Sequence, residues 1–147
     1  MRLLWSNIAL GLMLLAGTAL AANHHSLNGT WKLIPNRTEY AGEPAVQTGT
    51  VTINDREHNI YISRSFSYDG QNQTSDYNFT TDGRENSSIR QGKTFKTKAK
   101  WDGRILNVTT IGDKGEEHER YSLEPDGTMM LVVERPGHSP MTLHFEQ

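Results

Sequence analysis

The sequence predicts an all-β protein, a small antiparallel up-and-down β-barrel of about eight to ten strands. Two-residue turn signals recur at short intervals, and the segments between them are rich in Val, Ile, Thr, Tyr and Phe. Asp-Gly supplies the positive φ angles of tight hairpins, and β-branched and aromatic residues favour strands. Closure removes exposed strand edges, whereas a sandwich would need longer crossovers than the sequence offers. The signals lie at Asp69-Gly70, Asp82-Gly83, Asp102-Gly103, Gly112-Asp113, Pro125-Asp126-Gly127 and Pro136-Gly137.

The first 21 residues indicate an export signal. A short basic start precedes an almost entirely apolar stretch from Leu3 to Leu15, and Ala19-Leu20-Ala21 has the small-x-small pattern that signal peptidase recognises. We expect cleavage after Ala21, with Ala22 as the alternative. The apolar stretch is shorter than the ~20 residues of a spanning helix, so we expect no stable membrane anchor after cleavage.

Residues 22–147 then form a single barrel domain with 14 basic and 17 acidic residues, a net charge of −3. This balance argues against nucleic acid and anionic membrane surfaces, both of which attract basic proteins. The chain has no cysteine. An exported domain of this size without disulfides is typical of bacteria, so a periplasmic or secreted location is expected.

The first two strands are separated by the one long connection, residues 35–46, which contains Pro35, Gly42 and Pro44 and lacks apolar periodicity. It is expected to be a loop or lid. The strand expected over 85–90 has the weakest pattern. In chain order the strands are predicted at residues 28–34, 47–54, 59–67, 72–80, 85–90, 93–101, 104–111, 116–123, 128–134 and 139–146.

Two hairpins predict which side chains face inward. The turn at Asp102-Gly103 would place Trp101 opposite Arg104, Ala99 opposite Leu106 and Thr97 opposite Val108. Lys96, Lys98 and Lys100 then lie on the outer face, either in water or as a basic ligand patch; the solvated face is favoured. The turn at Asp69-Gly70 aligns Ile60, Ile62, Arg64 and Phe66 with Phe79, Tyr77, Ser75 and Gln73.

The segment Leu27-Asn28-Gly29-Thr30-Trp31-Lys32-Leu33 resembles the opening Gly-x-Trp strand of the calycin superfamily, which includes lipocalins, avidins and fatty-acid-binding proteins. The resemblance implies that Trp31 closes one end of the barrel. Residues 100–103 and 131–134 are similar to late hairpins of fatty-acid-binding proteins, and the chain also resembles small exported bacterial lipocalin-like proteins.

Two departures from the fatty-acid-binding proteins stand out. Residues 35–46 are too short for the helical lid of that family. Leu143-His144-Phe145 stands where the family carries the Arg-x-Tyr pair that anchors a carboxylate. The resemblance therefore does not support fatty-acid anchoring by that motif.

Arg64 interrupts an inward apolar series and is a candidate partner for a ligand carboxylate, because a guanidinium can form two parallel hydrogen bonds. The alternatives are a place near the rim or an internal pair with a carboxylate such as Glu119. Tyr77 and Thr97 would add hydroxyl contacts. Four further side chains would line a pocket or fill a closed core: Phe66, Phe79, Phe95 and Leu106.

Two segments could suggest a metal. Either cleavage product has His in third position, His24 or His25, and the terminal amine, two amides and that imidazole form a square-planar site for Cu(II) or Ni(II). In Glu116-Glu117-His118-Glu119, by contrast, Glu117 and Glu119 share a strand face that His118 does not. We expect this segment to be a solvated hairpin.

No catalytic motif accompanies the barrel: Gly-x-Ser-x-Gly, a glycine-rich phosphate loop and cysteine are all missing from the sequence. We therefore expect no enzyme and no cofactor. The favoured hypothesis is an exported lipocalin-like barrel that binds a small, largely apolar molecule in its interior. The alternative is a packed scaffold that engages another exported protein, for example as an enzyme inhibitor, through residues 35–46.

Overall fold

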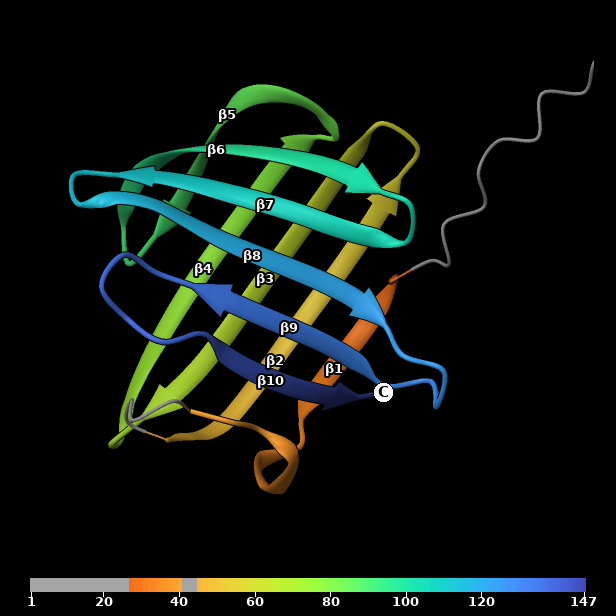
Figure 1. Cartoon of the computed structure of the whole chain (residues 1–147), viewed down its shortest axis with the longest axis vertical. Coiled ribbons are helices and arrows are strands. Elements are labelled where there is room, and N and C mark those ends of the chain that lie inside the picture. The colour runs from red at the N-terminus through yellow and green to blue at the C-terminus, as the bar shows by residue number, and fades with distance from the viewer. Residues whose placement is uncertain (1–26, 41–44) are drawn as a thin grey trace, which may run out of the picture.

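The computed structural model describes residues 27–40 and 45–147, which form a closed barrel of ten antiparallel strands (Figure 1). Each strand pairs with its neighbours in sequence, and β1 closes the ring by pairing with β10. The predicted fold class and all the predicted strands are confirmed. The strands are β1 Gly29–Leu33, β2 Val46–Arg56, β3 Asn59–Tyr68, β4 Gln71–Thr80, β5 Asp82–Arg90, β6 Lys93–Asp102, β7 Ile105–Gly112, β8 Gly115–Leu123, β9 Met129–Glu134 and β10 Met141–Glu146.

A 3₁₀ helix, η1 (Pro35–Arg37), follows β1, and Glu39 then bridges to Thr142 beside β10. The described part of this connection, residues 34–40 and 45, contains no strand or α-helix, as its proline content predicts. Within the described ranges, no helix has the length and apolarity needed to cross a membrane.

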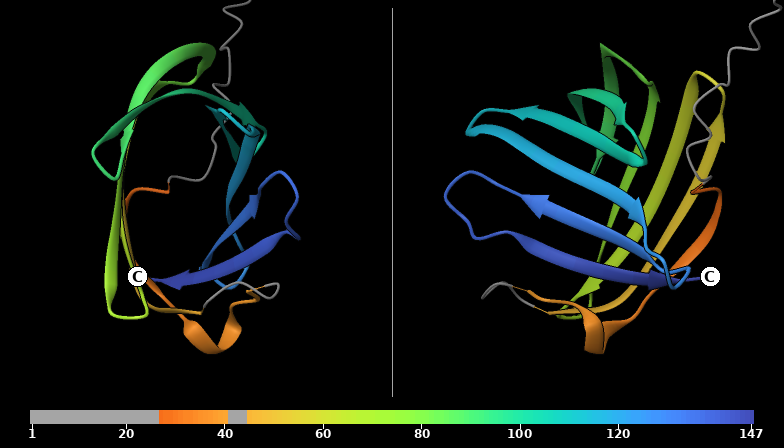
Figure 2. Two further views of the ribbon diagram at one scale, coloured as in Figure 1. Left: turned by 90° about the vertical axis from the view of Figure 1, so that its left-hand side faces the viewer. Right: turned by 45° about the vertical axis from the view of Figure 1, so that its right-hand side comes forward.

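Because the strands alternate in direction, their connections gather at two ends. We call the mouth the end that holds η1 and the turns β3–β4, β5–β6, β7–β8 and β9–β10, and the opposite end the far end. In Figure 1 the strands β7–β10 cross in front of β2–β4, and Figure 2 shows the two curved walls facing each other across the interior. Side chains from β3 and β8 can therefore meet inside the barrel.

The hairpin at Asp69-Gly70 has the predicted register, with Arg64 opposite Ser75 and Phe66 opposite Gln73. Asp69 and Gly70 both take positive φ angles, 45° and 76°, as a tight hairpin turn requires.

The register predicted at Asp102-Gly103 is wrong by two residues. Trp101 pairs with Leu106 and Ala99 with Val108, since Asp102 still pairs with Ile105 and the turn lies at Gly103 and Arg104. A shift of two residues keeps every side chain on its face. The predicted inward face is therefore confirmed, and the lysines at 96, 98 and 100 are exposed on the outer face as expected.

Large apolar side chains fill the far half of the interior. Trp31 is 2% exposed, and its Nε1 donates a hydrogen bond to the Leu27 carbonyl at 2.8 Å. The alternation along each strand aims one apolar residue after another inward. We call this the packed half; its members near the far end are Ile60, Phe79, Leu106, Tyr121 and Met129, all at most 1% exposed.

Candidate functional site

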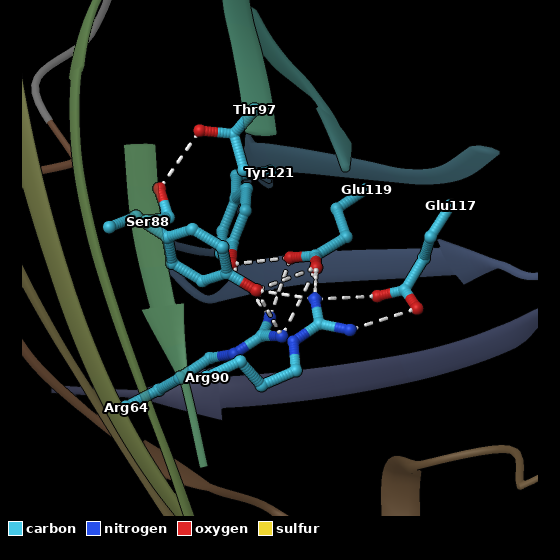
Figure 3. Close-up of polar contacts among 8 residues, drawn as sticks. Arg64, Ser88, Arg90, Thr97, Glu117, Glu119 and Tyr121 are labelled. Atoms are coloured by element: carbon cyan, nitrogen blue, oxygen red, sulfur yellow. Dashed lines mark hydrogen bonds and ion pairs between the residues drawn. The ribbon is translucent and has the colours of Figure 1, made fainter. Parts of the chain in front are cut away.

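The half of the barrel next to the mouth, which we call the mouth half, contains a buried ion pair that joins the two walls (Figure 3). Arg64 on β3 donates to Glu119 on β8 through both terminal nitrogens: Nη1 to Oε2 at 2.6 Å and Nη2 to Oε1 at 3.1 Å. Arg64 is 9% exposed and Glu119 is 1% exposed. The structure thus shows the internal pair that the sequence left open as an alternative, and the Arg64 guanidinium is committed to Glu119 instead of being free for a ligand carboxylate.

Two tyrosines complete the hydrogen bonding of this pair. Tyr77 accepts from Arg64 Nη2 at 2.8 Å and donates to Glu119 Oε1 at 3.1 Å. Tyr121 accepts from Arg64 Nη1 at 3.0 Å and donates to Glu119 Oε2 at 2.8 Å. Burial raises the pKa of Tyr77 to about 12 and that of Tyr121 well above its ordinary value. Both phenols therefore remain protonated and can donate to Glu119.

A second ion pair lies nearer the mouth. Arg90 on β5 donates to Glu117 on β8, with Nη2 at 2.9 Å from Oε1 and Nη1 at 3.1 Å from Oε2. Arg90 Nη2 also donates to the Tyr77 hydroxyl at 2.7 Å and to Glu119 Oε1 at 3.3 Å. The side chains of Arg90 and Glu117 are 24% and 16% exposed. This pair is therefore connected to the buried one and is in partial contact with solvent.

The expectation of a solvated hairpin at residues 116–119 is wrong for two of its glutamates. Glu117 and Glu119 share a face, as predicted, but that face is the interior of the barrel, where Arg64 and Arg90 compensate their charge. Glu116 and His118 point outward and are exposed. Within the part of the chain that the structure describes, no group of three or more His, Cys, Asp or Glu side chains could hold a metal ion.

The four charged side chains of this network balance one another. Burial by itself would raise the pKa of Glu119, but the positive charges of Arg64 and Arg90 outweigh it and hold that pKa below its ordinary value. Burial likewise disfavours the Arg64 cation, but Glu119 raises the pKa of Arg64 well above its usual range. Two cations and two anions therefore share the site, and its formal charge is zero. We call Arg64, Arg90, Glu117 and Glu119 the charged network.

Two cavities adjoin the charged network at the mouth. The larger has a volume of about 330 Å³ and the smaller about 90 Å³. Arg90, Glu117 and Arg135 line both, so the Arg90–Glu117 pair stands between them. Other side chains of the larger cavity are Phe95, Thr110, Asp113, Lys114, Pro136 and His138, and those of the smaller include Arg64, Phe66, Ser75, Val133 and Met141.

The predicted ligand residues divide between these regions. Phe95 lines the larger cavity, and Phe66 and Arg64 line the smaller one. Tyr77 belongs to the hydrogen-bond system around the charged network. Phe79 and Leu106 instead belong to the packed half, which is the second of the two roles that the sequence allowed for them. Thr97 is buried and shares a hydrogen bond of 2.8 Å with Ser88 (Figure 3).

Sequence analysis missed Arg90, Glu117 and Thr110 as site residues. Arg90 ends the strand with the weakest pattern, yet its guanidinium lies 5.7 Å from the centre of the Phe95 ring, a cation–π arrangement. Thr110 follows Leu106 and Val108 at intervals of two on β7, a spacing that places all three on the inner face. That alternation was the available signal. The predicted export signal, residues 1–21, and the metal candidates His24 and His25 lie outside the described residues.

No protein-family model matches the chain, and no curated protein matches it. Among solved structures it is similar to a mutant of the REP1-NXSQ fatty acid transporter, with 22% identity and a TM-score of 0.63 over 82% of this chain and 97% of that chain. It is also similar to the fatty-acid-binding protein isolated from Manduca sexta, with 14% identity and a TM-score of 0.58 over 82% of this chain and 98% of that chain. The chain thus has the ten-stranded, calycin-like barrel fold of the fatty-acid-binding proteins.

Proposed function

We propose that this protein binds a small, largely apolar molecule in the mouth of its barrel, without covalent chemistry. The observation that carries the proposal is the larger cavity of about 330 Å³, with Phe95 and Pro136 in its wall. Sites for small molecules are typically ~300–1,000 Å³, mostly apolar, and carry a few polar groups that orient the ligand. The similar structures are described as a fatty acid transporter and a fatty-acid-binding protein, which supports a carrier of apolar molecules.

The packed half limits the size of the proposed ligand. Buried side chains such as Ile60, Phe79 and Leu106 fill the interior toward the far end. The charged network lies between them and the mouth cavities. A ligand would therefore lie at the mouth, against Phe66, Phe95 and the Arg90–Glu117 pair, and would be a compact molecule.

We also propose that the protein works in the periplasm or is secreted. The basic start, apolar stretch and Ala19-Leu20-Ala21 pattern support export, and the absence of cysteine fits a bacterial periplasm. Detection of the mature protein, beginning at Ala22 or Asn23, in a periplasmic extract or culture medium would test this part of the proposal.

The binding proposal is tested first by native mass spectrometry of the protein purified from its own source, followed by denaturation. A mass loss of a few hundred daltons would support a carrier and identify its ligand class. A bare protein mass would not contradict the proposal by itself, since a weakly held ligand is lost on purification. Titration with the neutral fluorescent probe N-phenyl-1-naphthylamine therefore decides the matter.

A blocking variant makes this titration specific to the mouth. Gly112 lines the larger cavity, and a Cβ added there would meet the Gly115 carbonyl oxygen at 3.7 Å, an ordinary contact. Gly112→Leu should therefore fold, fill the cavity and weaken probe binding about tenfold or more. Thr94→Leu adds a comparable side chain on the exposed outer face of β6 and should bind like the unmodified protein. No saturable binding, or equal binding by both variants, would favour the scaffold that engages another exported protein.

A further inference from the structure

We propose that the ligand carries an uncharged polar group, such as an alcohol or a primary amide, and that the mouth discriminates against free carboxylates. This inference rests on the proposed function and specifies its ligand class. Its basis is the arrangement of the charged network together with two unpartnered polar atoms beside the larger cavity.

Two of the arginines at the mouth, Arg64 and Arg90, are already neutralised by the chain's own glutamates. Arg64 holds both oxygens of Glu119, and Arg90 holds both oxygens of Glu117. Bidentate pairing of this kind uses the terminal nitrogens that would otherwise grip a ligand carboxylate. At Arg90, an incoming carboxylate would have to displace Glu117 or add a third negative charge beside Glu117 and Glu119. Either course is unfavourable at a site partly withdrawn from water.

The hydrogen-bonding capacity that remains suits a neutral group. Among the residues that the structure describes, Thr110 Oγ1 and Arg90 Nε are buried and have no hydrogen-bond partner. Both residues line the larger cavity, and Thr110 is only 4% exposed. Arg90 Nε offers an N–H donor, whereas the Thr110 hydroxyl can both donate and accept. An alcohol or a primary amide has both a donor and an acceptor and can satisfy the two atoms without adding charge.

The remaining charged side chains at the mouth are of both signs: Arg135 lines both cavities, and Asp113 and Lys114 line the larger one. Asp113 and Lys114 occupy the β7–β8 turn and are exposed. Their charges are opposite in sign, so this pair adds no net charge to the rim. Water and salt screen such exposed charges, whereas the charged network is largely shielded. We expect selectivity to arise at Arg90, Glu117 and Thr110, and tighter binding of a carboxylate would point to Arg135 instead.

The test compares two probes of equal chain length, decan-1-ol and decanoate, by isothermal titration calorimetry at neutral pH. The unmodified protein should bind decan-1-ol about tenfold or more tightly than decanoate. Glu117→Gln keeps the shape of the side chain but removes its charge, so it should tighten decanoate binding about tenfold and leave decan-1-ol nearly unchanged. Glu116→Gln removes the same charge one residue earlier, on the outer face of β8, and should reproduce the unmodified protein.

A second variant tests the hydrogen bond without altering charge. Thr110→Val removes the hydroxyl and should weaken decan-1-ol binding about three- to tenfold, with decanoate affected less. Thermal unfolding of each variant establishes that it is folded, and the comparison of the two probes on the unmodified protein needs no variant at all.

The outcomes separate this inference from the function on which it rests. Equal or tighter binding of decanoate by the unmodified protein would overturn the neutral-ligand inference and leave a carrier of apolar molecules standing. Binding of neither probe, together with no binding of N-phenyl-1-naphthylamine, would overturn both. A Glu117→Gln protein that binds decanoate no better than the Glu116→Gln protein would remove Glu117 as the source of selectivity and would also contradict the inference.

Discussion

The packed half and the mouth half of the barrel are built from the same strands but have opposite interiors. On β8, Tyr121 is fully buried toward the far end and only its hydroxyl reaches the Arg64–Glu119 pair, whereas Glu117 and Glu119 face arginines toward the mouth. On β3, the inward positions change in the same way from the apolar Ile60 and Ile62 to the charged Arg64. Apolar burial stabilises the fold at one end, and charge that needs compensation occupies the other. The comparison predicts that changes in the packed half affect stability without affecting the binding proposed at the mouth, whereas changes in the charged network can affect both.

The largest effect is expected from breaking the buried ion pair. Glu119→Ala leaves Arg64 as an uncompensated buried cation, which should lower the free energy of unfolding by about 3–5 kcal/mol. Urea unfolding measures this loss. The triple variant Arg64→Met, Glu119→Leu, Tyr121→Phe replaces the pair and one hydroxyl by apolar groups. Its stability should be close to that of the unmodified protein or higher; a triple variant as unstable as Glu119→Ala would mean that the pair itself stabilises the fold.

The same pair should make the free energy of unfolding depend on pH. Arg64 and Arg90 hold the pKa of Glu119 below its ordinary value in the folded protein. As the pH falls, Glu119 is therefore protonated in the unfolded chain at a higher pH than in the folded protein. The stabilising contribution is therefore present above the ordinary carboxyl pKa and is lost as the pH falls through the lowered one. Urea unfolding between neutral pH and pH 3 should show this loss, and the triple variant should show a shallower one.

A cavity in the packed half should affect stability alone. Leu106 is fully buried, so Leu106→Ala should cost about 2–5 kcal/mol. Because Leu106 lies toward the far end, the affinity for N-phenyl-1-naphthylamine should be unchanged under conditions where the variant is folded. Weaker probe binding would show that the ligand reaches into the packed half, and the separation of the two halves would then fail.

The sequence predicted the strands of the barrel better than the residues of the candidate site. Alternation and Asp-Gly turns were enough for ten strands and for the register at Asp69-Gly70, because both are local signals. They could not distinguish a turn at Asp102-Gly103 from one at Gly103-Arg104, since the two registers bury the same side chains. The inward face was therefore predicted correctly from a register that was wrong.

The charged network could not be predicted without knowing how the barrel closes. Alternation placed Glu117 and Glu119 on one face, but acidic side chains are usually exposed, so the outer face was the natural expectation. Only closure brings β3 opposite β8 and gives these glutamates the arginines that make burial tolerable. Glu119 was foreseen as one possible partner of Arg64, whereas Arg90, at the end of a weakly patterned strand, gave no comparable signal.

A smaller effect is expected where the two halves meet, at Ser88 and Thr97. Their hydroxyls share a buried hydrogen bond of 2.8 Å. Thr97→Val leaves the Ser88 hydroxyl without this partner and should cost about 1–3 kcal/mol in urea unfolding. The double variant Ser88→Ala, Thr97→Val removes both partners and should recover most of that loss. A double variant with the summed cost of the two single ones would indicate that packing at this boundary matters more than the hydrogen bond.

The smallest effect is expected on the outer face, which belongs to neither half. Lys96 lies 3.6 Å from Glu85 in an exposed ion pair, and such pairs contribute little because water screens them. Lys96→Ala should therefore change the free energy of unfolding by less than about 0.5 kcal/mol. Replacing Lys98 and Lys100 as well should leave binding of N-phenyl-1-naphthylamine and decanoate unaltered. Weaker decanoate binding by the triple variant would instead support the basic ligand patch, and recognition would then extend beyond the mouth to the outer surface of β6.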